Sequence, residues 1–88
     1  MNKQRRAAIA AIRSEVDRLG EQVEALRGRI EDLRDEEQDY YDNMPESLQG
    51  AERGEAAEQA IAHLGDAVDA LEEFDPESIA EALDSAAQ

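Results

Sequence analysis

The stretch IAAIRSEVDRLGEQVEALRGRIEDL, residues 9–33, decides the fold of this chain of 88 residues. Large apolar residues recur in it at alternating intervals of three and four, which is the spacing of a coiled-coil heptad. With Ile9 taken as position a, the a and d residues are Ile9, Ile12, Val16, Leu19, Val23, Leu26, Ile30 and Leu33. No proline occurs before Pro45, so one long helix of about 60 Å is predicted for residues 4–42.

The rest of the chain is too short to cover such a helix. Residues 55–74 carry a broad apolar arc, which predicts a second amphipathic helix folded back on the first as a hairpin. At about 30 Å this second helix covers only half of the first. We therefore predict an oligomeric helical bundle or coiled coil, a dimer or larger, with the eight a and d residues as the oligomer interface.

The sequence leaves the direction of helix association open. β-Branched residues at a with Leu at d favour a parallel pair. An antiparallel pair centred on Gln22 would instead place Glu15 opposite Arg29 of the second chain, but its e positions would place Arg13 opposite Arg34. Charge alone does not choose between the two arrangements.

The remaining segments predict an all-α single domain over residues 1–88. Asp75 followed by Pro76 is a strong helix start and predicts a short third helix over residues 76–86. Residues 43–54 form a corner, in which Asn43 is expected to cap one helical turn. Gly54 is expected either to cap the second helix or to allow close backbone approach.

Charge and composition exclude several classes of function. Residues 1–34 contain eight Lys/Arg and six Asp/Glu, whereas residues 35–88 contain seventeen acids and Arg53 alone, so the net charge is +2 in the first segment and −16 in the second. Such a field opposes direct binding of nucleic acid. The sequence contains no long apolar run of the kind that forms a membrane span or a signal peptide, and it contains no Cys. We expect a cytoplasmic protein that is not an enzyme and holds no cofactor or metal.

Arg53 makes the corner a candidate binding site. In one interpretation its guanidinium clamps the carboxylates of Asp39, Asp42 or Glu46 and locks the hairpin. In the other it forms part of a pocket for a ligand or a partner side chain, together with neighbouring polar and aromatic residues. The candidate site residues are Tyr40, Tyr41, Asn43, Glu46, Gln49 and Arg53. Tyr40 continues the d positions and is expected to pack, whereas Tyr41 is expected to be more exposed.

Three segments at this corner carry a resemblance to a group of proteins. They are DEEQ at residues 35–38, DNMPESLQ at 42–49 and ERGE at 52–55. With them the chain resembles small, largely uncharacterised acidic helical proteins of phages, prophages and bacterial mobile elements. The resemblance implies phage accessory functions, including counter-defence, and in that case the host cytoplasm as location.

Three functions are compatible with these patterns. We favour a non-enzymatic, oligomeric interaction protein that sequesters a host protein or a small anionic signalling ligand. The first alternative is an acidic DNA mimic that blocks a nucleic-acid-binding protein. The second is a structural assembly or scaffold element, which requires no pocket.

Overall fold

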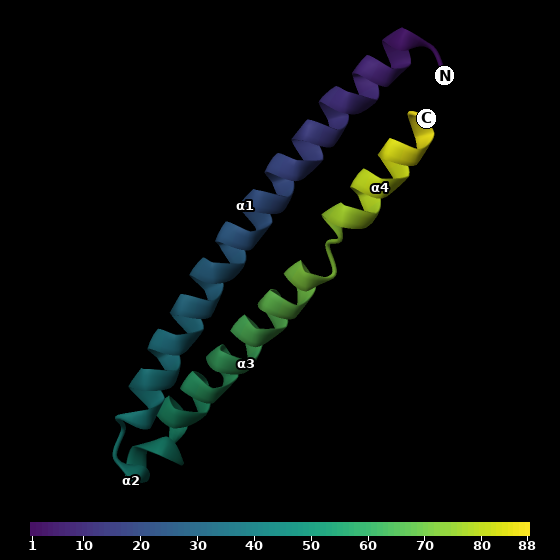
Figure 1. The fold of residues 1–88 in the computed structure, drawn as a ribbon. Coiled ribbons are helices and arrows are strands. Elements are labelled where there is room, and N and C mark those ends of the chain that lie inside the picture. Colours follow the sequence, from purple (N-terminus) through teal and green to yellow (C-terminus); the bar gives the residue numbers. More distant parts are fainter. The chain divides into compact units, whose positions relative to one another are not determined.

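The chain is all-helical in a computed structural model that describes residues 1–88. Its helices are α1 (Lys3–Asp42), α2 (Glu46–Gln49), α3 (Glu52–Glu72) and α4 (Pro76–Ala86), shown in Figure 1. This arrangement confirms the predicted fold class of a long helix, a helical corner, a second helix folded back and a short last helix. Contacts divide the chain into unit 1, Met1–Ala25 with Phe74–Gln88, and unit 2, Leu26–Glu73. That the chain forms one domain stays a prediction.

α1 contacts the returning helices through its a and e positions. From Ile9 onward, every a residue and every e residue of α1 is partly buried, and every d residue is exposed. These e residues, which the sequence did not predict to be covered within the chain, are Arg13, Gly20, Arg27, Arg34 and Tyr41. The a residues of a heptad repeat are flanked by d residues on one side and by e residues on the other, so a partner helix can cover a together with either column. Within this chain, the returning helices cover a together with e.

In unit 2, the contacts between α1 and α3 recur every seven residues on both helices. The Tyr41 hydroxyl donates to Glu58, and the guanidinium of Arg27 lies 2.8 Å from a carboxylate oxygen of Glu72. Between these two contacts, Arg34 lies against Gly65, where an added Cβ would be 3.8 Å from Nη1 of Arg34. Each step of seven residues back along α1, from Tyr41 to Arg34 to Arg27, thus corresponds to a step of seven residues forward along α3. The two helices therefore share one repeat of seven residues.

In unit 1, α4 lies along the first part of α1. Nε of Arg13 is 2.8 Å from Oδ1 of Asp84, and the ring of Pro76 lies against Gly20. The prediction that another chain must cover this part of the long helix is wrong for its a positions, which are partly buried within the chain together with the e positions. Three basic e residues of α1 therefore face the acidic returning helices. Part of the positive charge in the first segment of the sequence is thus placed beside the negative charge of the second.

The corner differs from the prediction at both of its helix starts. α2 begins at Glu46 after Pro45 with no side-chain cap, so the predicted Asn43 cap is wrong. A proline disfavours helical geometry in the residue before it, and the Asn43 N–H instead extends α1 by donating to Asp39 O. α3 begins at Glu52 rather than at residue 55, which places Gly54 inside its first turn. Gly54 is not a cap, but it does allow the expected close approach, to the backbone of Gln49.

Few residues of either unit are shielded from solvent. The buried residues are Gly54, Ala57, Val68 and Ala80, and no large side chain is fully buried. Small domains depend on buried large apolar side chains for most of their stability. Contacts within one chain therefore leave much of the apolar surface of α1 in water.

The start of α4 confirms the predicted cap and predicts a pH dependence. The hydroxyl and the backbone N–H of Ser78 donate to the Asp75 carboxylate at 2.6 and 3.1 Å, and these bonds lower the pKa of Asp75. Because the folded pKa is lowered, this cap stabilises α4 above the ordinary pKa of an aspartate, and its contribution is lost as the pH falls through the folded value. Asp75→Ala should increase amide hydrogen exchange in α4 at neutral pH, whereas Asp75→Asn, which retains an acceptor, should change it little. Equal exchange in wild type and Asp75→Ala would contradict the role of this cap.

Candidate functional site

The most prominent surface feature is an exposed apolar stripe along α1. We define the d stripe as five residues spaced seven apart, Ile12, Leu19, Leu26, Leu33 and Tyr40. Each is between 44% and 52% exposed. At about 100° per residue, the d positions lie about 80° around the helix from the middle of the a and e positions, so the returning helices do not reach them. The d stripe is thus an apolar helix face without a partner in the chain.

The predicted oligomer interface is consequently divided. Its a residues, Ile9, Val16, Val23 and Ile30, are partly buried within the chain, whereas its d residues are exposed. The predicted difference between the two tyrosines is reversed for the same reason. Tyr40 at d is 51% exposed, and Tyr41 at e is partly buried against α3.

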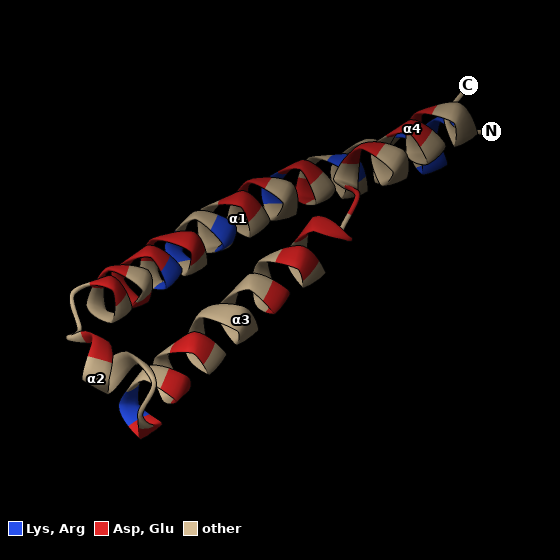
Figure 2. Cartoon of the chain, turned by 90° about the horizontal axis from the view of Figure 1, so that it is seen from below, with Lys and Arg blue, Asp and Glu red and all other residues tan.

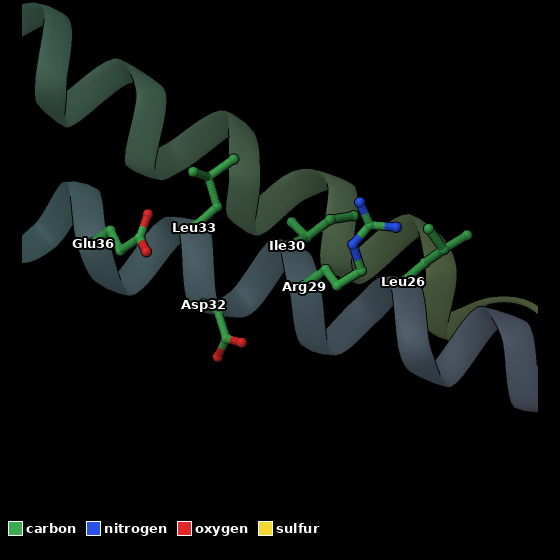
Figure 3. Close-up of a pocket in the computed structure, with 6 residues that line it drawn as sticks. All are labelled: Leu26, Arg29, Ile30, Asp32, Leu33 and Glu36. Atoms are coloured by element: carbon green, nitrogen blue, oxygen red, sulfur yellow. The ribbon is translucent and has the colours of Figure 1, made fainter.

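Within unit 2, the d stripe borders an open hollow of about 470 Å³. Its lining comes from α1 alone and consists of Leu26, Arg29, Ile30, Asp32, Leu33 and Glu36. In Figure 3, Leu26, Ile30 and Leu33 project from one side of α1, with Arg29 between them. Two leucines seven residues apart therefore flank a space that is apolar in the middle and charged at its edge, which suits an apolar helix better than a polar ligand.

The g positions of α1 form the charged edge of the d stripe. They are Glu15, Gln22, Arg29 and Glu36, and all four are exposed. Neither Glu15 nor Arg29 forms an ion pair within the chain, whereas Arg13 and Arg27 at e are both paired with acids of α3 or α4. Glu15 and Arg29 therefore keep their charges available to a neighbouring molecule.

The corner brings only part of the predicted site together. Nε2 of Gln49 donates to the backbone oxygen of Tyr41 at 3.1 Å, so these two residues are in contact. No side-chain hydrogen bond or ion pair joins Asn43, Glu46 or Arg53 to them. Arg53 is exposed in the first turn of α3, and its predicted clamp on Asp39, Asp42 or Glu46 is wrong, because α3 starts early enough to hold Arg53 on its outer surface.

Tyr41 provides a spectroscopic test of the hairpin contact. The hydrogen bond to Glu58, then burial, then the charges of Glu58 and Asp42 raise the pKa of Tyr41. In a Tyr40→Phe background, where Tyr41 is the only tyrosine, Glu58→Gln should lower the pKa read from the ultraviolet absorbance of tyrosinate. Glu55→Gln, on the same helix but outside the contact, should leave the pKa unchanged. A pKa that Glu58→Gln does not move would show that the Tyr41–Glu58 contact is absent in solution.

The returning helices present a strongly acidic surface. Figure 2 shows acids distributed along α3 and α4. Arg53 is the one Lys or Arg residue after Arg34 in the sequence. The exposed acids of α3 include Glu55, Asp66 and Asp69. Glu55 and Asp69 form no ion pair within the chain, and Nδ1 of His63 lies 3.9 Å from a carboxylate oxygen of Asp66. This surface attracts cationic partners and repels phosphate.

Comparisons with known proteins add no assignment to this geometry. The chain matches no protein-family model, no curated protein and no solved structure. None of its helices combines the length and the apolar character that crossing a bilayer requires. The d stripe with its charged g edge is therefore the surface from which a function is argued.

Proposed function

We propose that this chain is a non-enzymatic helical interaction protein that associates with copies of itself through the d stripe. One observation carries the proposal, namely that five regularly spaced large residues are about half exposed on a single helix face while the neighbouring a residues pack inside the chain. Contiguous exposed apolar surface of this kind marks a protein interface. The sparse burial within each unit supports the same proposal, since a partner chain adds the missing apolar contacts.

The mass of the protein in solution tests this proposal. One chain has a mass of 9.7 kDa. Light scattering coupled to gel filtration should give at least twice this value at micromolar concentration. A mass of 9.7 kDa across the accessible concentration range would overturn the proposal.

Two features support the proposed target, a host protein. They are the negative charge of α3 and α4 and the resemblance of the corner to phage proteins. An associated form with its acidic α3 and α4 exposed suits a cytoplasmic counter-defence role, in which a host protein with a basic surface is sequestered. Exposed acids along α3 and α4 also favour the alternative of a DNA mimic. Capture of a host protein that normally binds nucleic acid, with release by competing duplex DNA, would favour the mimic. Capture that DNA does not compete would favour sequestration at another surface.

A further inference from the structure

The charged edge of the d stripe determines how two copies of α1 meet. We infer that the self-association is an antiparallel, two-fold symmetric pairing of α1 with α1 of a second copy, centred on Gln22. This inference rests on the proposed function, because it specifies the partner and the register of the d stripe. We assign a second copy of the chain as the partner of the d stripe, because the charges at the g positions of two copies complement each other.

The e positions no longer oppose an antiparallel arrangement. In a seam built on a and d, an antiparallel pair would bring Arg13 of one chain near Arg34 of the other. In the structure, Arg13 is paired with Asp84 within unit 1, and Arg34 lies against Gly65 within unit 2. Both arginines are therefore directed at the returning helices. The edge that faces a second copy of α1 consists of g residues instead.

The g positions are complementary in the antiparallel pair centred on Gln22. Glu15 and Arg29 are each seven residues from Gln22 on opposite sides, so Glu15 of either copy faces Arg29 of the other, twice in each dimer. Gln22 meets Gln22 of the second copy on the symmetry axis, where two amides can donate to and accept from each other. Both charged residues are exposed and have no ion pair within their own chain.

Other arrangements of the same face lose the pairing of Glu15 with Arg29. In a parallel two-fold pair, the g edges of the two copies lie on opposite sides of the seam, so Glu15 does not meet Arg29 of the second copy. Sliding one copy of the antiparallel pair by seven residues along the other would place Glu15 opposite Glu36 of the second copy. Like charges placed opposite each other are unfavourable, so the shifted register is selected against, and the parallel pair lacks the attraction between Glu15 and Arg29.

The apolar layers fit the same register. With Gln22 at the centre, Leu19 of one copy meets Leu26 of the other, and Ile12 meets Leu33. The hollow between Leu26 and Leu33 in unit 2 then receives Ile12 and Leu19 of the second copy. Charge pairing and apolar packing thus select one alignment.

Charge reversal tests the register. Glu15→Arg and Arg29→Glu should each replace two attractive pairs by two repulsive ones and raise the dissociation constant of the dimer about tenfold. The double variant Glu15→Arg/Arg29→Glu should restore the wild-type dissociation constant, because the pairs reform with exchanged signs. Glu36→Arg is the matched control, since it changes the net charge as Glu15→Arg does but faces Ala8 in this register, and it should not weaken the dimer. Sedimentation equilibrium of the full chain measures all five proteins.

The outcomes separate the register from the proposed function. A wild-type protein of 9.7 kDa at every concentration would overturn the proposed function itself. A wild-type dimer that neither single reversal weakens would overturn the antiparallel register and leave self-association in place. Weakening by both single variants without recovery in the double variant would also overturn the pairing of Glu15 with Arg29.

Discussion

Replacing Leu19 and Leu26 by Glu is expected to convert the self-associated protein into single chains of 9.7 kDa. Both leucines are nearly half exposed in the isolated chain, so the substitutions disturb few contacts within it. Burying a leucine contributes about 1.5–3 kcal/mol, and a symmetric dimer buries both of these leucines from each copy. The dissociation constant should therefore rise at least about 1,000-fold, measured by light scattering over a dilution series.

A matched pair of substitutions controls for the added charge. Ser14 and Gly28 both occupy f positions, away from the d stripe, and nothing lies within 4 Å of a Cβ built on Gly28. Ser14→Glu/Gly28→Glu adds the same two negative charges and should remain associated. If both double variants dissociate equally, general repulsion between acidic chains explains the effect, and the assignment of the interface to the d stripe fails.

Alanine at Gly54 and alanine at Gly28 are expected to change stability in opposite directions. A Cβ on Gly54 would overlap the Gln49 carbonyl group and lie 2.6 Å from Cα of Gln49, so the backbone of the corner must move. Overpacking of this kind costs about 1–3 kcal/mol, and here it exceeds the gain in helix propensity of about 1 kcal/mol. Gly28 has open space around it, and Gly28→Ala should raise the free energy of unfolding by about 1 kcal/mol.

Thermal unfolding by circular dichroism distinguishes the two variants. A change of 1 kcal/mol shifts the melting temperature by about 4–8 °C in a domain of this size. All samples need the same chain concentration, because association stabilises the folded state by mass action. A melting temperature of Gly54→Ala equal to or above that of wild type would contradict the close approach of α3 to Gln49.

Local sequence signals predicted the helices well. The unbroken repeat without proline predicted α1, and Asp75 with Pro76 predicted the start of α4 at the correct residue. Each of these signals acts through the backbone of a few adjacent residues, so the chain carries it without reference to tertiary structure. The start of α3 was predicted three residues late, because Gly54 was assigned to the corner although its lack of a side chain serves helix packing there.

Tertiary choices were harder to predict from the sequence. A heptad pattern gives the spacing of an apolar face, but not which of its two flanks the chain covers by itself. The arginines at positions 13, 27 and 34 were the available signal, because they share the e column and face an acidic second half of the chain. Which of Tyr40 and Tyr41 is covered depends on the same choice of flank, and for this reason the predicted exposures of the two tyrosines were reversed. The corner binding site stays a prediction for all of its residues, Tyr40, Tyr41, Asn43, Glu46, Gln49 and Arg53.

The shared repeat of α1 and α3 makes the length of the hairpin in unit 2 adjustable in steps. Tyr41, Arg34 and Arg27 meet residues 58, 65 and 72, so one step of seven on α1 corresponds to one step of seven on α3. Removing seven residues from both arms would leave every remaining contact with its partner. A deletion of another length would rotate the e column away from α3 by about 100° for each residue. Related chains could therefore differ in size by whole heptads and keep the same packing.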